Sequence, residues 1–150
     1  MGVRSKDLLA RDTFLALCRA HEALQVGGAE LFKAHGLTAV QFNVLRILRG
    51  GDRDGLACQT IGERLVTRVP DVTRILDRME RDGLLTRERS AVDRRVVLVR
   101  ISDAGLRLVD QLDEPVMALH RAQFQSLARG ELEALESALL TLASTGAPRT

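Results

Sequence analysis

The sequence predicts a mainly α fold with one small β-hairpin, an α+β class. Long stretches towards both ends of the 150-residue chain repeat their apolar residues every three or four positions, as amphipathic helices do. Residues 85–89 and 96–101 instead have the length and alternation of strands, and a short polar turn separates them. Apolar residues make up 45% of the chain, which is enough to bury a core and excludes a largely disordered protein. The length of residues 1–150 fits a single chain with one globular part and helical extensions.

The first helix is expected over residues 8–35. Two glycines, Gly27 and Gly28, lie inside it and cost roughly 1 kcal/mol each relative to alanine. We therefore expect one long helix that is softened or kinked there and that ends at Gly36. Its periodic apolar residues are Leu8, Leu9, Phe14, Leu15, Leu17, Cys18, Leu24, Leu31 and Phe32.

The middle of the chain, residues 38–101, has the element order of a winged helix-turn-helix. Thr38 and Gln41 fit a capping box that opens a second helix, and residues 50–55 form a loop. Residues 59–82 are then predicted to form a helix, a short turn and a second helix. Pro70 is expected in the first turn of that second helix, where proline is tolerated. The strands at 85–89 and 96–101 follow as a hairpin.

The C-terminal part, residues 102–143, is expected to be helical. Ser102 is the expected N-cap, Pro115 should kink the helix that follows, and a last helix covers about residues 131–143 before a tail at 144–150. Residues 8–35 and 102–143 are too apolar for a monomer of this size. We interpret them as dimerisation helices.

Charge and cysteine content narrow the class of partner and compartment. Residues 56–101 carry ten arginines and seven acidic residues, a balance of +3, whereas residues 102–150 carry four and seven, a balance of −3. A basic middle region favours phosphate as a partner.

The chain has two isolated cysteines and no predicted secretory or membrane-spanning segment. These features predict a reduced, cytoplasmic protein that does not bind membranes.

The run VTRILDRMERDGLLTRERSAVDRRVVLVRISDAG, residues 72–105, resembles the MarR family of bacterial transcriptional regulators. The matching features are the helix VTRILDRMERDGLL, the Asp-x-Arg of the hairpin tip and the exit IS-x-x-G, which in the family is usually LT-x-x-G. The order of elements matches over about residues 8–143. The resemblance implies a homodimer that binds pseudo-palindromic double-stranded operator DNA, most often as a repressor. Many members release DNA when a small phenolic or aromatic effector binds, some respond to cysteine oxidation, and a few use zinc as co-repressor. For this chain no cofactor is predicted.

The helix that starts near residue 70 is the predicted recognition helix. Thr73 and Arg74 can reach a base edge or a phosphate, and Arg74 could alternatively pair with Asp93 of the hairpin. Asp71 either caps the helix or accepts from a cytosine. The remaining expected DNA contacts of this region are Gln59, Thr60, Arg68, Pro70 and Arg78; acidic neighbours suggest a salt-bridged surface role for Arg81.

The hairpin tip SAVDRR is the predicted wing. A narrow minor groove attracts arginine, and the family pattern places Asp93 and Arg95 at matching positions. We expect Asp93 to hold an arginine in place, Arg95 to enter the groove and Arg94 to add attraction for phosphate. The alternative is a solvated charged turn without a binding role.

Other site hypotheses are weaker. An effector pocket between the long helices and the winged helix would be mostly aliphatic, with His21, Phe42 and Arg46 as candidate lining residues.

Redox control through Cys18 or Cys58 is an alternative function. Cys18 is better explained as a small core residue, because the chain has no Tyr to support a sensing thiol. No metal site or enzyme motif stands out. A winged-helix protein that binds other proteins is the remaining class, and the two arginines of the wing disfavour it.

Overall fold

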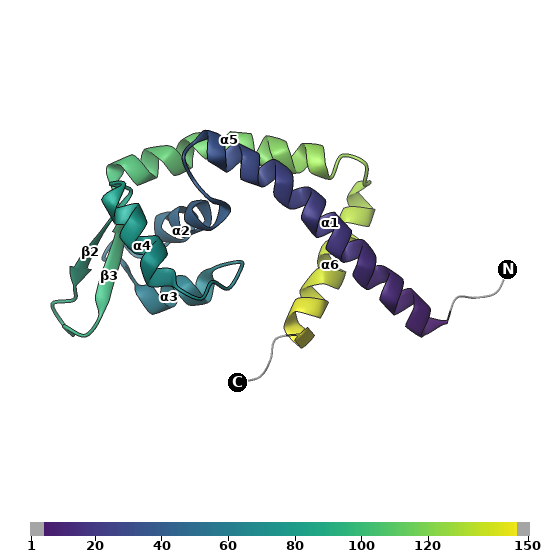
Figure 1. The fold of residues 1–150 in the computed structure, drawn as a ribbon, viewed down its shortest axis with the longest axis horizontal. Coiled ribbons are helices and arrows are strands. Elements are labelled where there is room, and N and C mark those ends of the chain that lie inside the picture. The colour runs from purple at the N-terminus through teal and green to yellow at the C-terminus, as the bar shows by residue number, and fades with distance from the viewer. Residues whose placement is uncertain (1–4, 147–150) are drawn as a thin grey trace. The chain divides into compact units, whose positions relative to one another are not determined.

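The structure, a computed structural model, describes residues 5–146, and Figure 1 shows the order of its elements. Within those residues it has six helices and three strands, so the predicted fold class is confirmed. The elements are α1 (Lys6–Ala34), α2 (Ala39–Arg49), β1 (Leu56–Ala57), α3 (Cys58–Arg64), α4 (Val72–Arg81), β2 (Leu85–Arg89), β3 (Val97–Ile101), α5 (Asp103–Gln123) and α6 (Arg129–Gly146).

The helix α1 is continuous across Gly27 and Gly28. Ser5 caps its start by accepting a hydrogen bond from the Leu8 backbone N–H at 3.3 Å. At its end Gly36 has φ 70°, a left-handed conformation that glycine adopts without the penalty a side chain would bring. The single long helix and its glycine stop are therefore confirmed, and its softening or kink at the two glycines stays a prediction.

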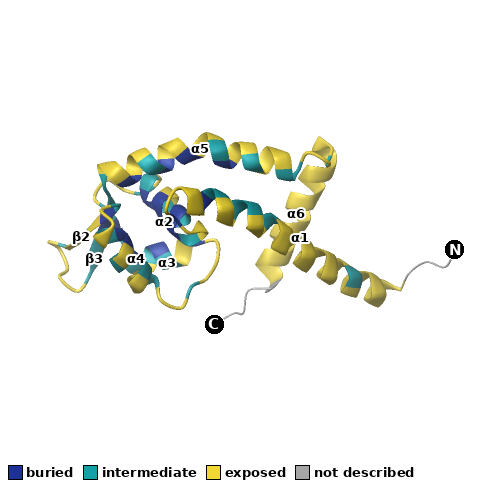
Figure 2. Ribbon diagram, turned by 45° about the horizontal axis from the view of Figure 1, so that its top comes forward, coloured by how far each residue is buried: buried dark blue, intermediate teal, exposed yellow. Residues whose placement is uncertain are grey.

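The core is formed by the winged-helix part together with Phe32 at the end of α1 and the first half of α5. The capping box of α2 is present, since the Gln41 N–H donates to Thr38 Oγ1 at 3.2 Å and the Thr38 N–H donates to Gln41 Oε1 at 2.9 Å. Figure 2 shows the buried residues gathered on α2, α4, the sheet and α5. The largest fully buried side chains are Leu45, Ile61, Leu76, Met79, Leu85, Leu112, Val44, Val99 and Val109.

The sheet has the order β1-β3-β2, with both neighbouring pairs antiparallel. The hairpin register pairs Leu85 with Ile101 and Arg89 with Val97, so the predicted hairpin is confirmed. The two-residue strand β1 was not predicted, because Leu56 and Ala57 are too few to show an alternation.

The C-terminal region includes a boundary between two compact units, Met1–Val116 and Met117–Thr150. In the first unit, Ser102 Oγ accepts from the Gly105 N–H at 3.0 Å and donates to the Gly83 carbonyl at 2.6 Å, which confirms Ser102 as a cap. Helix α5 continues through Pro115. In the second unit α6 extends to Gly146, which corrects the predicted start of the tail at residue 144; residues 147–150 lie outside the described part.

The terminal helices leave apolar side chains exposed. Cys18 is also exposed on α1, so its expected role as a core residue is wrong for the single chain. No helix in the described residues has the length and apolar character required to cross a membrane. The exposed apolar residues of α1 and α6 are Leu8, Leu9, Phe14, Leu15, Leu17, Val26, Leu132, Leu135, Leu139, Leu140 and Leu142.

Candidate nucleic-acid interface

The N-terminus of α4 is capped by Asp71, whose Oδ1 accepts from the Arg74 backbone N–H at 3.0 Å. This hydrogen bond favours a capping role for Asp71 over the alternative contact with a cytosine. Pro70 lies before the cap, so its expected place inside the first helical turn is wrong. Thr73 and Arg74 follow the cap and are both exposed, as a DNA-reading surface requires.

The wing is a closed turn with its own hydrogen bonds. Asp93 Oδ1 accepts from the Arg95 backbone N–H at 3.0 Å, and the Asp93 carbonyl accepts from the Val96 N–H at 3.0 Å. A guanidinium nitrogen of Arg89 donates to the Arg94 carbonyl at 2.8 Å. Asp93 thus positions Arg95 through the backbone, and the described residues show no ion pair between Asp93 and Arg74. The side chains of Arg94 and Arg95 are exposed.

The recognition helix and the wing face a common space. Thr73 of α4, Gln59 of α3 and Arg95 of the wing line one hollow of about 350 Å³, with Cys58 in its wall. A second hollow, of about 480 Å³, is lined in part by Gln59 and Arg68. Residues that were predicted from separate motifs are therefore brought together on neighbouring surfaces.

A partly buried ion-pair network joins α4 to the wing through a residue that the sequence analysis missed. The Arg87 backbone N–H donates to Glu80 Oε1 at 3.0 Å, and its guanidinium donates to Glu80 Oε2 at 2.8 and 3.0 Å. A further guanidinium nitrogen lies 2.5 Å from Asp77 Oδ1. Two of the acids near Arg81, Asp77 and Glu80, thus bind Arg87 instead, and Arg81 donates to the Asp77 carbonyl at 3.4 Å. The signal available in the sequence was the i, i+3 spacing of the two acids, which places both on one face of the helix.

The other expected contacts are less distinctive. Gln59 donates to Glu63 Oε1 at 2.9 Å, within α3, and Thr60 is half-buried. Arg78 is exposed on α4, one turn beyond Arg74. These side chains are available to DNA, but nothing in their geometry assigns them a base or a phosphate.

The predicted effector residues are not gathered around one hollow. Phe42 is 6% exposed and its ring stacks on that of Phe32 with centroids 4.6 Å apart. His21 is exposed and hydrogen bonds Gln25 at 3.2 Å, and Arg46 is exposed on α2. Neither hollow described above includes these residues, and their effector role stays a prediction.

The thiol of Cys58 is unfavourably placed for redox chemistry. Burial raises the pKa of the Cys58 thiol, and the positive charge of Arg87 only partly offsets that effect. A raised pKa leaves less reactive thiolate at neutral pH. Across residues 5–146 no group of three His, Cys, Asp or Glu side chains is arranged to bind a metal ion.

The sequence model of the MarR family matches residues 37–97, which span α2 to the start of β3. An uncharacterised helix-turn-helix transcriptional regulator of Bacillus subtilis, YkoM, is 31% identical over 129 residues, covering 84% of this chain and 80% of that protein. The chain belongs to the MarR family. Its membership confirms the resemblance seen in residues 72–105 and makes transcriptional regulation its class of function.

Solved structures of MarR proteins share the fold. A MarR transcription factor from Planctomyces limnophilus is 35% identical, with a TM-score of 0.70 over 94% of this chain and 99% of that one. A mutant of MarR from Escherichia coli, solved in complex with operator DNA, has a TM-score of 0.79 at 22% identity, over 93% and 99% of the two chains. At 22% identity, the similarity to the E. coli structure establishes only that the two chains share a fold.

Proposed function

We propose that this MarR-family chain is a homodimeric, sequence-specific DNA-binding repressor. The observation that carries the proposal is that Thr73 of the recognition helix and Arg95 of the wing line the same hollow. A helix and a wing that face one space can enter adjacent grooves of one duplex, with a sugar-phosphate strand between them. An E. coli protein with the same fold is complexed with operator DNA, which supports duplex DNA as the partner of this chain.

The residues divide by role in this proposal. Thr73 and Arg74 contact the major groove, while Arg95 enters the minor groove, with Arg94 beside it on the phosphates. Residues that only position these groups are Asp71 and Asp93, through the backbone hydrogen bonds described above. The supporting contacts to phosphate are assigned to Gln59, Thr60, Arg68 and Arg78. Pro70 has no N–H to donate, so its proposed contact with DNA is apolar.

Dimerisation is proposed from the apolar surface left on α1 and α6. Phe14 is 64% exposed and Leu140 is 65% exposed, and a soluble chain does not leave so many large apolar residues in water without a partner. A two-fold dimer would present two α4 helices to successive major grooves, so half-sites should lie ~10 bp apart, centre to centre. Release of DNA by a small aromatic effector, and a cytoplasmic location beside the chromosome, complete the proposal.

The test is selection of bound sequences from a random duplex pool by the purified full chain, followed by fluorescence anisotropy on the enriched duplex. We expect a pseudo-palindrome and binding that weakens steeply with added salt. The Arg95→Ala variant should bind the enriched duplex less tightly. Recovery of no common sequence would refute sequence-specific binding and would favour a winged helix that binds other proteins.

A further inference from the structure

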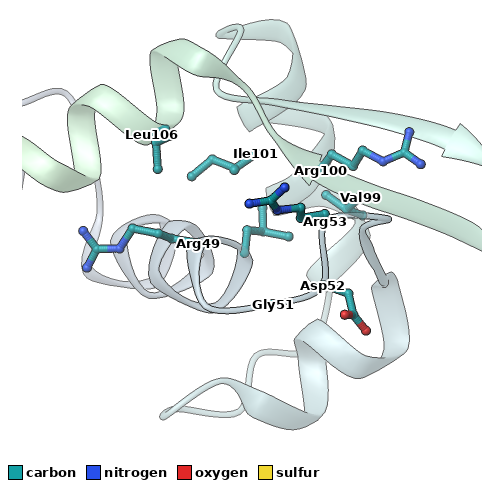
Figure 3. A pocket seen from close by; sticks show the side chains of 9 residues that line it. Arg49, Gly51, Asp52, Arg53, Val99, Arg100, Ile101 and Leu106 are labelled. Atoms are coloured by element: carbon teal, nitrogen blue, oxygen red, sulfur yellow. The ribbon is translucent and has the colours of Figure 1, made fainter.

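A separate pocket lies at the base of the wing, between the end of α2, the loop that follows it, β3 and the first turns of α5 (Figure 3). Its volume is about 270 Å³. None of the residues assigned above to DNA or to the predicted effector site lines it. It is also smaller than the ~300–1,000 Å³ of sites for drug-sized ligands, so its occupant has to be small.

One part of the lining of this pocket is aliphatic. Leu48 and Val99 belong to the core and are 6% and 0% exposed, and Ile101 is half-buried beside them. Leu106 of α5 borders the pocket with 38% of its surface exposed. A ligand with an apolar body would remove this leucine surface from water, which is favourable at about 25 cal/mol per Å².

Two of the three arginines around the pocket are already neutralised. Arg49 forms ion pairs with Asp110 at 2.8 Å and with Asp113 at 2.7 Å. Arg100 pairs with Glu88 at 2.7 Å and donates to the Asp54 carbonyl at 3.1 Å. In Figure 3 both side chains lead away from the middle of the pocket.

Arg53 differs from these two arginines. In Figure 3 its guanidinium lies over the middle of the pocket, whereas the Asp52 carboxylate points away. Within the part of the chain that the structure describes, no carboxylate forms an ion pair with Arg53. Its planar set of N–H donors is therefore free to bind two oxygens of one anion side by side.

The turn that carries Arg53 is fixed against the sheet. The Gly55 N–H donates to the Asp52 carbonyl at 3.0 Å, and Gly55 has φ 94°. A Cβ at Gly55 would lie 2.9 Å from the Val99 carbonyl oxygen, so only glycine lets the turn approach β3 this closely. The anchored turn thus fixes the backbone that carries Arg53, so little backbone entropy is lost on binding, while the exposed Arg53 side chain loses its own rotamer freedom.

From this arrangement we infer a second binding site in this chain, for a small carboxylic acid with an aliphatic body. The carboxylate accepts two hydrogen bonds from Arg53, and the hydrocarbon part covers Leu106 and contacts Ile101. Arg95 lies in the wing turn just before β3, and the pocket includes Val99, Arg100 and Ile101 of that strand, so the site lies on the strand that follows Arg95. It shares no residue with the proposed DNA interface, so its occupation does not compete with DNA for the same side chains.

The experiment uses cyclohexanecarboxylate as the probe and its neutral amide, cyclohexanecarboxamide, as the isosteric control. Both are titrated to millimolar concentration into the full chain with labelled methyl groups, followed by NMR. We expect shifts at the methyl groups of Leu48, Val99 and Leu106, and at least about tenfold weaker binding of the amide, since a charge-assisted hydrogen bond is lost. Equal binding of acid and amide, no binding of the acid, or shifts confined to residues around Phe42 would overturn the inference.

Two variants locate the site. Arg53→Gln should weaken binding of the acid about tenfold, while the matched control Arg107→Gln, an exposed arginine of α5 outside the pocket, should leave it unchanged. Leu106→Ala should weaken acid and amide to a similar extent, because it removes only apolar contact. An Arg53→Gln variant that binds the acid like wild type refutes the site. DNA binding by the same variants should persist, so a failure here is separate from a failure of the proposed function.

Discussion

Arg87 of β2 and Glu80 of α4 are joined by three hydrogen bonds, one from the backbone N–H and two from the guanidinium. The Arg87 side chain is 21% exposed, and its guanidinium also forms an ion pair with Asp77. A half-buried pair of this kind fixes geometry more than an exposed pair can, because both partners have lost rotamer freedom. The relationship ties the recognition helix to the first strand of the wing.

The first prediction concerns this link. Replacement of Glu80 by Gln should leave the chain folded but lower its affinity for operator DNA about tenfold, since the wing is no longer fixed relative to α4. The matched control is Glu88→Gln, which removes the same charge from the more exposed pair with Arg100 and should leave affinity nearly unchanged. Circular dichroism checks the fold and fluorescence anisotropy the affinity. Equal losses in the two variants would show a general effect of charge.

The second prediction concerns acid stability. Hydrogen bonds from Arg49 hold the pKa of the Asp113 carboxyl below its usual range. A group whose pKa is lowered by folding stabilises the folded state above its unfolded pKa of about 3.9, and that contribution is lost as the pH falls through the lower, folded value. Arg87 acts in the same direction on the pKa of Glu80. We therefore expect these two contributions to stability to decrease progressively as the pH falls below about 4.

The measurement is urea denaturation of wild type and Arg49→Met between pH 6 and pH 3. The difference in free energy of unfolding between the two proteins should shrink as the pH is lowered, because protonated Asp113 gains little from Arg49. A difference that stays constant across this range would mean that Arg49 stabilises the chain through packing rather than through its ion pairs with Asp110 and Asp113.

The third prediction concerns the wing. Arg95→Ala should lower affinity about tenfold, most strongly for operators with A·T-rich flanks, whose narrow minor groove attracts arginine. Asp93→Ala should lower it less, because Asp93 acts through the Arg95 backbone N–H. A titration with salt should show a smaller slope for Arg95→Ala. An unchanged affinity at every salt concentration would remove Arg95 from the interface.

The fourth prediction concerns assembly. Phe14→Asp places a charge on the exposed apolar face of α1 and should convert the proposed dimer to monomer at micromolar concentration. Val66→Asp makes the same chemical change at a residue that is 87% exposed outside the terminal helices, and should leave the dimer intact. Analytical ultracentrifugation separates the outcomes. Monomers of wild type would contradict the dimer itself.

The sequence was informative where local chemistry decides the structure. The capping box at Thr38, the glycine stop at Gly36 and the hairpin at residues 85–101 all follow from neighbouring residues, and the structure confirms them. The i, i+3 spacing of Asp77 and Glu80 places them on one helix face, but the sequence could not show that Arg87 is their partner, because Arg87 lies on another element whose approach depends on the tertiary fold. Asp93 was assigned to the wing correctly, but its hydrogen bond goes to a backbone N–H rather than to a side chain.

Cys18 shows the other reason for error. The position of Cys18 in an apolar helical pattern predicted that it would be buried in a core. A helix that is apolar on one face can equally pack against a second chain. In the single chain Cys18 is exposed. The pocket beneath Arg53 could not be predicted either. It is formed by the end of a helix, a loop, a strand and another helix, and no motif links those residues.

The last prediction concerns the joint between the wing and α5. A Cβ at Gly105 would clash with the Leu84 carbonyl oxygen and would lie 3.0 Å from an Ile101 side-chain carbon. Because the first contact is with backbone, Gly105→Ala cannot be relieved by a change of rotamer and should lower the free energy of unfolding by about 3 kcal/mol. Gly130→Ala in α6, where no atom lies within 4 Å, should instead be neutral or stabilise by up to about 1 kcal/mol. Thermal unfolding of both variants tests the difference, and similar midpoints would show that α5 can move away from Leu84.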